Sequence, residues 1–203
     1  MSLDLRIRQE AQALQQGVYK GNKDWSWRPH GHGTLRSKDL TYVGDFKHGE
    51  YHGMGEIKYA DGGLFVGKFA NSMRNGAGEL KVGELDFIVH WKDNKPEGKG
   101  NLSVPGSDYC GNFSNGLRHG EGTLYNEMEV GRPSYEGSWV KNKRHGKGKE
   151  WHIDSSMKFK GSFKDDQRDG PGLLITNDEV YEGGWKDGKR HGYGVQALSL
   201  GKY

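Results

Sequence analysis

An aromatic residue, a glycine two positions later and a second aromatic two further on recur roughly every 23 residues along this chain. The complete copies are Tyr42-Gly44-Phe46, Phe65-Gly67-Phe69, Tyr109-Gly111-Phe113, Tyr135-Gly137-Trp139, Phe159-Gly161-Phe163 and Tyr181-Gly183-Trp185. Phe87-Val89-Trp91 carries valine in place of the glycine, and Tyr19-Gly21 opens a degenerate first copy. Self-similarity at a fixed period of about 20 to 50 residues is typical of a repeat array. The sequence therefore predicts a repeat protein rather than a globular enzyme.

The composition agrees with a thin array of repeats. Apolar residues make up only 32% of the 203 residues, whereas 34 residues are glycine. The usual share of glycine is roughly 7%, and this chain has few large aliphatic side chains for a thick core. The 30 basic and 27 acidic residues leave a formal charge of +3. This balance disfavours a nucleic-acid binder with a wholly basic face.

The sequence also carries signals about the cellular compartment. Cys110 is the single cysteine, which excludes an intrachain disulfide and favours a reducing environment. No apolar run approaches the roughly 18 residues of a membrane-spanning helix, and the N-terminus lacks the apolar core of a signal peptide. We expect a soluble, cytoplasmic chain.

Each copy contains a turn signal six and seven residues after its first aromatic. The pairs at these positions are His48-Gly49, Asn71-Ser72, Asp93-Asn94, Asn115-Gly116, Lys141-Asn142, Asp165-Asp166 and Asp187-Gly188. Asn-Gly and Asp-Gly favour the type I′ turn of a two-residue β-hairpin, because both central residues need positive φ. A Gly-x-Gly pair follows each turn, as in Gly192 and Gly194. The pattern predicts one hairpin per copy and an antiparallel meander.

The turn also predicts the register and the two faces of the sheet. For the last copy it pairs Lys186 with Lys189, Trp185 with Arg190, Gly183 with Gly192 and Tyr181 with Gly194. Side chains alternate across a strand, so the aromatics and glycines share one face and polar residues occupy the other. The glycines leave room for the rings to lie flat. We expect this single layer to curl into an elongated trough lined by aromatics.

The segment from Tyr181 to Gly194 (YEGGWKDGKRHGYG) resembles the core of a MORN repeat (membrane occupation and recognition nexus). The resemblance implies an elongated β-meander with a grooved face that holds extended or helical segments of partner proteins. Similar proteins serve as cytoskeletal, ciliary and membrane-junction scaffolds, or as accessory modules beside catalytic domains. We expect three regions: a helical cap or docking segment at 1–16, the array at 17–196 and a short tail at 197–203. Copies start near residues 19, 42, 65, 87, 109, 135, 159 and 181.

Some parts of the chain depart from the repeat. In the first copy Lys23 replaces the second aromatic, and Trp25 and Trp27 lie nearby. A longer loop, from Asn126 to Ser134, separates two later copies. Because regular repeats offer similar surfaces, these irregular places are the better candidates for specific recognition.

The aromatic face supplies the candidate site, a groove for a partner segment. Its proposed residues are Phe69, Arg74, Trp91, Phe113, Arg118, Trp139, Arg144, Phe163, Arg168, Trp185 and Arg190. The rings have a structural alternative as the core of the array. The arginines can stack on rings as structural pairs, or they can form a file of cations for acidic peptides or phospholipid headgroups.

Other chemistry finds little support in the residues. His119, His145 and His191 occupy one position of separate copies, too far apart to share a metal ion. His30 and His32 lie two apart with no evident third ligand. No helix is expected after the Gly-x-Gly pairs, which disfavours a phosphate-binding loop. We expect neither catalysis, nor a cofactor, nor a metal.

The two ends of the chain differ from the array. Leu3, Ile7, Ala11 and Leu14 fall at helical spacing, and Gly17 would end such a helix. The helix is expected to cap the first repeat, with a docking or oligomerising role as the alternative. At the other end the strand with Val195, Ala197, Leu198 and Leu200 would be an unprotected edge, which predicts association between copies.

These observations favour a non-enzymatic protein-interaction scaffold, whose groove binds a peptide or helix of a partner protein. The alternative is a membrane-associated tether that binds anionic phospholipids through the arginines. From the family resemblance we expect association with the cytoskeleton or a cilium, and peripheral association with membranes is the alternative location. No nucleic-acid partner is expected.

Overall fold

The computed structural model describes residues 3–126, 133–151 and 158–198, which form one helix followed by antiparallel strands. The chain divides into two compact units, Met1–Ser103 and Val104–Tyr203, here called the N-terminal and C-terminal units. The all-β prediction, with a meander of hairpins and a short N-terminal helix, is confirmed.

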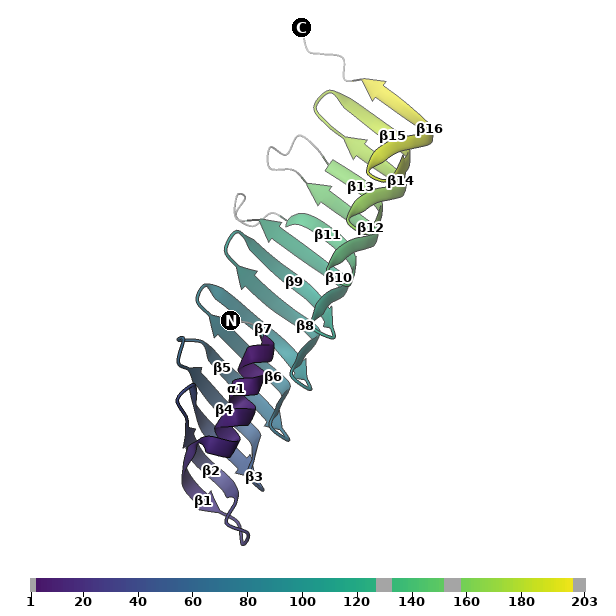
Figure 1. Cartoon of the computed structure of the whole chain (residues 1–203). Coiled ribbons are helices and arrows are strands. Elements are labelled where there is room, and N and C mark those ends of the chain that lie inside the picture. Colours follow the sequence, from purple (N-terminus) through teal and green to yellow (C-terminus); the bar gives the residue numbers. More distant parts are fainter. Residues whose placement is uncertain (1–2, 127–132, 152–157, 199–203) are drawn as a thin grey trace. The chain divides into compact units, whose positions relative to one another are not determined.

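The N-terminal unit contains helix α1 (Leu3–Gln16) and eight strands in chain order. The strands are β1 (Val18–Lys23), β2 (Pro29–Arg36), β3 (Leu40–Lys47), β4 (Glu50–Tyr59), β5 (Leu64–Ala70), β6 (Met73–Val82), β7 (Leu85–Lys92) and β8 (Lys95–Val104). Helix α1 lies across the strands of this unit in Figure 1, in purple.

The C-terminal unit repeats the hairpins without a helix among its described residues. Its strands are β9 (Ser107–Ser114), β10 (Leu117–Asn126), β11 (Pro133–Val140), β12 (Lys143–Trp151), β13 (Lys158–Lys164), β14 (Gln167–Ile175), β15 (Glu179–Lys186) and β16 (Lys189–Leu198). Most of the long loop between β10 and β11, flagged in the sequence as irregular, lies outside the described residues.

The turns form where the sequence predicts them. Asn142 and Asp166 have φ of 71°, and Asp187 has φ of 48°, in the left-handed region that a type I′ turn requires. Some turn residues also join one hairpin to the previous one. The side-chain oxygen of Asn94 accepts a hydrogen bond from the amide of Arg74 at 2.9 Å, and that of Asn142 accepts one from the amide of Arg118 at 2.8 Å. The turn residues therefore stack the hairpins as well as close them.

The predicted register is correct near the turn and wrong further along the strand. Lys186 pairs with Lys189 and Trp185 with Arg190, but Gly183 pairs with Gly194 rather than with Gly192, and Tyr181 pairs with Gln196. The reason is a β-bulge between these pairs, in which Gly192 adopts φ of 70°. The two glycines of the pair therefore differ in role, because only Gly194 lies beneath the ring of Tyr181.

A ladder of edge-to-face aromatic rings forms the core. Within a copy, the rings of Tyr135 and Trp139 are 5.1 Å apart, and the ring of Tyr135 is 5.2 Å from Phe163 of the next copy. The rings lie over glycines: a Cβ placed on Gly122 would come within 2.2 Å of the hydroxyl of Tyr109. Because the sheet forms a single layer, this ladder of rings provides the core that a second layer of structure would otherwise supply.

Candidate functional site

The rings proposed for the groove are core residues in the structure. The exposed fractions of Phe69, Phe113, Trp139, Phe163 and Trp185 are 6% or less, and Trp91 is fully buried. The rings therefore form the core of the array, because they shield one another and the arginines cover them. The side of the sheet that carries the rings and the arginines is here called the aromatic face.

The arginines hold successive copies together. Each faces the second aromatic of its own copy in the backbone register, as predicted: Trp139 pairs with Arg144 and Phe163 with Arg168. The guanidinium group, however, stacks on different rings. That of Arg168 lies 4.5 Å from the ring centre of Phe159 and 5.2 Å from that of Trp185 in the next copy. The guanidinium of Arg168 therefore contacts a ring of its own copy and a ring of the next one.

In the N-terminal unit α1 rests on the aromatic face through buried charges. The guanidinium of Arg6, 1% exposed, donates two hydrogen bonds to the carboxylate of Asp61, at 3.2 and 2.8 Å. It also lies 4.1 Å from the ring centre of Tyr59. Gly63 leaves the space that this guanidinium fills, since a Cβ there would come within 2.6 Å of it. The chain around β4 and β5 is therefore shaped to receive the helix.

A second buried contact joins the middle of α1 to one of the repeated arginines of the aromatic face. These arginines, here called the arginine file, are Arg74, Arg118, Arg144, Arg168 and Arg190. The carboxylate of Glu10, 3% exposed, accepts hydrogen bonds from the guanidinium of Arg74 and the hydroxyl of Tyr59. Arg74 is completely buried beneath the helix. Burial raises the pKa of Glu10, an effect that the charge of Arg74 opposes. The ion pair thus lies in a dry site that α1 itself closes.

The buried side of α1 differs from the sequence prediction. The apolar residues at helical spacing, Leu3, Ile7 and Leu14, are only half-buried and Ala11 is exposed. The helix instead buries Arg6, Glu10 and Ala13. The spacing of apolar residues could not predict this buried side, because its burial depends on contacts distant in sequence. Arg6 binds Asp61, 55 residues away, and Glu10 binds Arg74, 64 residues away.

In the C-terminal unit the sheet supplies its own carboxylates. Glu150 stands where other copies carry an aliphatic residue, and it binds Arg144 at 3.0 Å and Arg168 at 2.9 Å. Burial alone would raise the pKa of Glu150, but the two arginines outweigh it and hold the pKa below its ordinary value. Glu179 forms an ion pair with a single arginine, Arg190. Three arginines of the file are therefore already paired.

Arg118 is the exception. Its guanidinium is half-buried, 4.3 Å from the ring centre of Trp139 and 5.5 Å from that of Tyr109. It donates a hydrogen bond to the backbone carbonyl of Asn142 at 3.0 Å, and in the described part of the chain it forms no ion pair with a carboxylate. Burial lowers the pKa of Arg118. Leu124 occupies the position that Glu150 has in the next copy.

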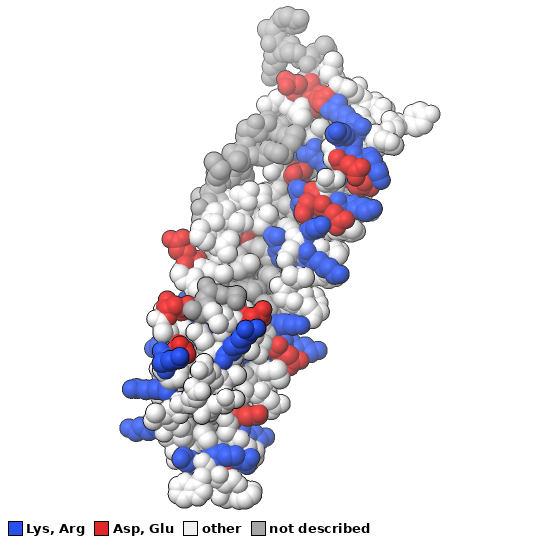
Figure 2. Space-filling view, in the orientation of Figure 1, with Lys and Arg blue, Asp and Glu red and all other residues white. Residues whose placement is uncertain are grey.

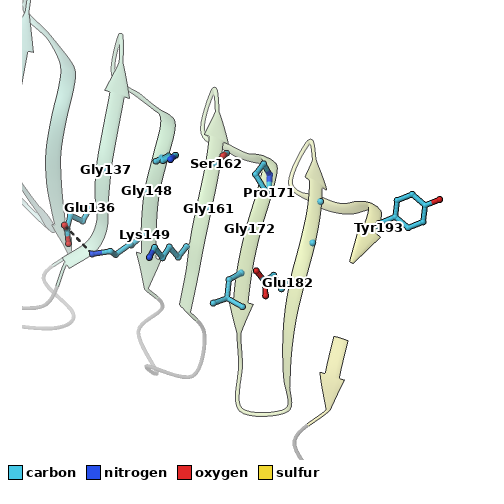
Figure 3. A pocket seen from close by; sticks show the side chains of 15 residues that line it. Glu136, Gly137, Gly148, Lys149, Gly161, Ser162, Pro171, Gly172, Glu182 and Tyr193 are labelled. Atoms are coloured by element: carbon cyan, nitrogen blue, oxygen red, sulfur yellow. Dashed lines mark ion pairs between the residues drawn. The ribbon is translucent and has the colours of Figure 1, made fainter. Parts of the chain in front are cut away.

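The opposite face of the C-terminal unit carries a shallow cleft of about 800 Å³. Its lining includes Lys147, Lys149 and Lys160 together with Glu136 and Glu182. Figure 3 shows Lys149 directed toward Glu136, with 3.7 Å between the charged atoms. No sequence pattern predicted this cleft. Because its charges of both signs offset each other, we assign it no ligand.

One cluster of potential metal ligands emerges that sequence reasoning missed. Ligand atoms of Asp24, His30 and His48 lie within 4.8 Å of one another. The guanidinium of Arg28, however, lies 2.9 Å from the carboxylate of Asp24 and 3.2 Å from Nδ1 of His48. A positive charge already occupies this position, so we assign the cluster to the turn between β1 and β2 rather than to a metal.

Comparison with known proteins agrees with the fold. A sequence model of the MORN repeat matches more than half of the chain, at residues 28–41, 42–64, 90–103, 109–126, 135–157, 159–178 and 181–197. The chain therefore belongs to the MORN-repeat family. Residues 65–89 lie outside these matches, although β5 and β6 form the same hairpin.

Two proteins illustrate the similarity. The chain is 34% identical to alsin of Homo sapiens, and equally to that of Mus musculus, over 150 residues that cover 70% of this chain and 9% of alsin. It is 33% identical over 109 residues to the ALS2 C-terminal-like protein of Bos taurus, covering 50% of this chain and 11% of that protein. The chain thus corresponds to about a tenth of the length of these relatives. No helix among its described residues is long and apolar enough to cross a bilayer.

Proposed function

We propose that this protein is a non-enzymatic interaction scaffold, and that the aromatic face of its C-terminal unit binds a helical segment of a partner protein. The observation that carries the proposal is the way α1 packs on the aromatic face of the N-terminal unit. On the N-terminal unit the same kind of face already holds a helix, and it does so by burying a carboxylate against an arginine of the file. The repeat therefore has the chemistry to hold a helix.

Arg118 is where we expect the partner's carboxylate. Arg74 stacks on Phe65 and Trp91 much as Arg118 stacks on Tyr109 and Trp139. The first of these arginines receives Glu10 from α1, whereas the second has no carboxylate among the described residues. A charge-assisted hydrogen bond to a half-buried guanidinium is stronger than one in water. The partner segment is thus expected to be amphipathic and acidic.

Two further parts of the hypothesis follow from the family rather than from the geometry. We place the scaffold in a cytoskeletal or ciliary assembly, which imaging of the tagged chain in ciliated cells tests. Tethering to anionic phospholipids through the arginines is the second candidate. We rank it lower, because Arg144, Arg168 and Arg190 already form ion pairs with Glu150, Asp166 and Glu179.

Association between copies through the last strand is also a proposal. All ten residues of β16 are exposed, including Val195 at 74% and Leu198 at 70%. Strand edges of this kind pair readily. Light scattering of the purified chain at high micromolar concentration is expected to show a mass above that of the monomer.

The partner proposal is tested by affinity capture from cell extract with the intact chain and with Arg118→Glu. Lys160→Glu is the matched control, because it makes the same change of charge on an exposed lysine of the opposite face. Circular dichroism establishes that each variant folds. We expect a stoichiometric protein that is lost with Arg118→Glu and retained with Lys160→Glu. Equal capture by both variants would contradict the proposed site.

A further inference from the structure

The turn between β1 and β2 exposes two tryptophans. Trp25 is 88% exposed and Trp27 is 79% exposed, whereas the tryptophans of the aromatic ladder are almost completely buried. The turns that close the next hairpins of this unit consist of His48-Gly49, Asn71-Ser72 and Asp93-Asn94 and carry no large apolar side chain. In Figure 1 this turn forms the lower tip of the N-terminal unit. The first hairpin therefore presents a feature that the next hairpins of this unit lack among their described residues.

The backbone that presents the tryptophans is held in place. The buried carboxylate of Asp24 accepts hydrogen bonds from the amides of Ser26 at 2.9 Å and Arg28 at 3.1 Å, and from Nε of Arg28 at 3.0 Å. Nδ1 of His48, from the neighbouring hairpin, lies 3.0 Å from the same carboxylate. Trp27 adopts φ of 62°, which is uncommon for a bulky residue and persists only where the surroundings enforce it.

The charges around the turn are mainly positive. Lys20, Lys23 and Arg28 are exposed on this hairpin, and Lys47 is exposed on the next one. The ammonium of Lys23 lies 5.7 Å from the ring centre of Trp27. Asp24 is already paired with Arg28. Figure 2 shows this part of the N-terminal unit as an uncharged tip with lysine and arginine side chains beside it.

We propose that residues 24–28 form a membrane-contact tip, in which Trp25 and Trp27 enter the headgroup region of an anionic bilayer. Tryptophan favours this region because its ring is apolar and its indole N–H finds a polar partner. The exposed Lys20 and Lys23 of this hairpin attract anionic headgroups. The site uses neither the arginine file nor the aromatic face, and it is independent of the proposed protein partner.

The test is sedimentation of the full chain with vesicles of phosphatidylcholine containing phosphatidylserine. The double variant Trp25→Ser/Trp27→Ser removes the rings, and Tyr193→Ser is the matched control, because Tyr193 is a fully exposed aromatic of the other unit. We expect the double variant to bind at least about tenfold more weakly, and the control to bind like the parent. Replacing Lys20 and Lys23 by glutamine is expected to weaken binding roughly fivefold for each lysine.

A second readout reports insertion directly. Lipids brominated along the acyl chain near the headgroup quench the fluorescence of tryptophans that reach them. The parent chain is expected to be quenched and the double variant is not, while circular dichroism shows both to be folded. The proposal is overturned if the parent does not bind these vesicles, or if the double variant binds equally well. It is also overturned if binding is lost with Arg118→Glu and retained in the double variant, since the arginine file would then hold the lipid.

Discussion

The two units have the same hairpins and the same ladder of rings, yet they neutralise their arginines differently. In the N-terminal unit the carboxylate opposite Arg74 comes from Glu10 of α1, 64 residues away in sequence. In the C-terminal unit the carboxylate opposite Arg168 comes from Glu150, a residue of the sheet. The comparison shows that one arginine position can be satisfied by its own sheet or by a docked helix. Arg118 has neither among the described residues, which is why we expect a partner there.

The largest expected effect is on the helix of the N-terminal unit. Glu10→Ala leaves the guanidinium of Arg74 buried without its carboxylate, and removing one partner of a buried pair costs about 3 to 5 kcal/mol. The cost is limited by release of α1, which admits water to Arg74. We therefore expect residues 3–16 to lose their protection from amide exchange while β9–β16 keep theirs. Asp4→Ala, an exposed carboxylate of the same helix, is the control. Unchanged exchange of α1 in the Glu10→Ala variant would show that the pair does not hold it.

The second prediction concerns what the units share. Gly55→Ala places a methyl group 2.5 Å from the ring of Tyr42, and Gly122→Ala places one 2.2 Å from the hydroxyl of Tyr109. Overpacking of this kind costs about 1 to 3 kcal/mol. Chemical denaturation should reveal a loss of similar size in each unit, because the ladder is the same. A large loss in one unit and none in the other would mean that the ladder is not a common core.

The third prediction separates the paired arginines from Arg118. Arg168→Met retains an unbranched apolar stem but leaves Glu150 with one arginine, so both the stacking and a part-buried charged hydrogen bond are lost. We expect a loss of about 2 kcal/mol in the free energy of unfolding. Arg118→Met removes the stacking only, at a cost of about 0.5 to 1 kcal/mol. Equal losses would imply that Arg118 has a carboxylate partner within the chain.

The smallest effects are those of pH, and the units should respond in opposite directions. The folded pKa of Glu150 lies below its ordinary value of 4.5, so its contribution to stability is present above that value and is lost as the pH falls. Burial raises the folded pKa of Glu10 against the opposing charge of Arg74, so the cost of burying its ionised carboxylate lowers stability as the pH rises through that pKa. Amide exchange measured against pH, with Glu10→Gln and Glu150→Gln, checks each slope. If the change of stability with pH remains after the glutamate of that unit is replaced by glutamine, another titratable group causes it.

Much of the fold could be predicted because the same local sequence pattern recurs in each copy of the repeat. The turn residues, the two faces and the pairing of Trp185 with Arg190 all follow from local spacing. The bulge at Gly192 could not be inferred, because a glycine needed for positive φ and one needed for space look alike in a sequence. Equally, the spacing of apolar residues in α1 could not reveal that Arg6 and Glu10 are buried, since their partners lie far along the chain.

The candidate site was predicted less completely than the fold. The sequence located the arginine file but treated its members as equivalent. Their differences depend on single residues elsewhere in the sheet, such as glutamate at 150 where another copy has Leu124. A comparison between copies of the residue that pairs with the first aromatic could have distinguished Arg118 from the other arginines of the file.

Site-specific photo-crosslinking tests the central claim most directly. A photoreactive amino acid replaces Leu124, which shares the aromatic face with Arg118, or Glu121, whose side chain lies on the opposite face of the same strand. Both chains are irradiated in cell extract, with and without Arg118→Glu. The account predicts a covalent protein adduct at position 124 that disappears with Arg118→Glu, and no such adduct at position 121. The same adduct from both positions, or one that survives Arg118→Glu, would contradict binding of a partner at this face.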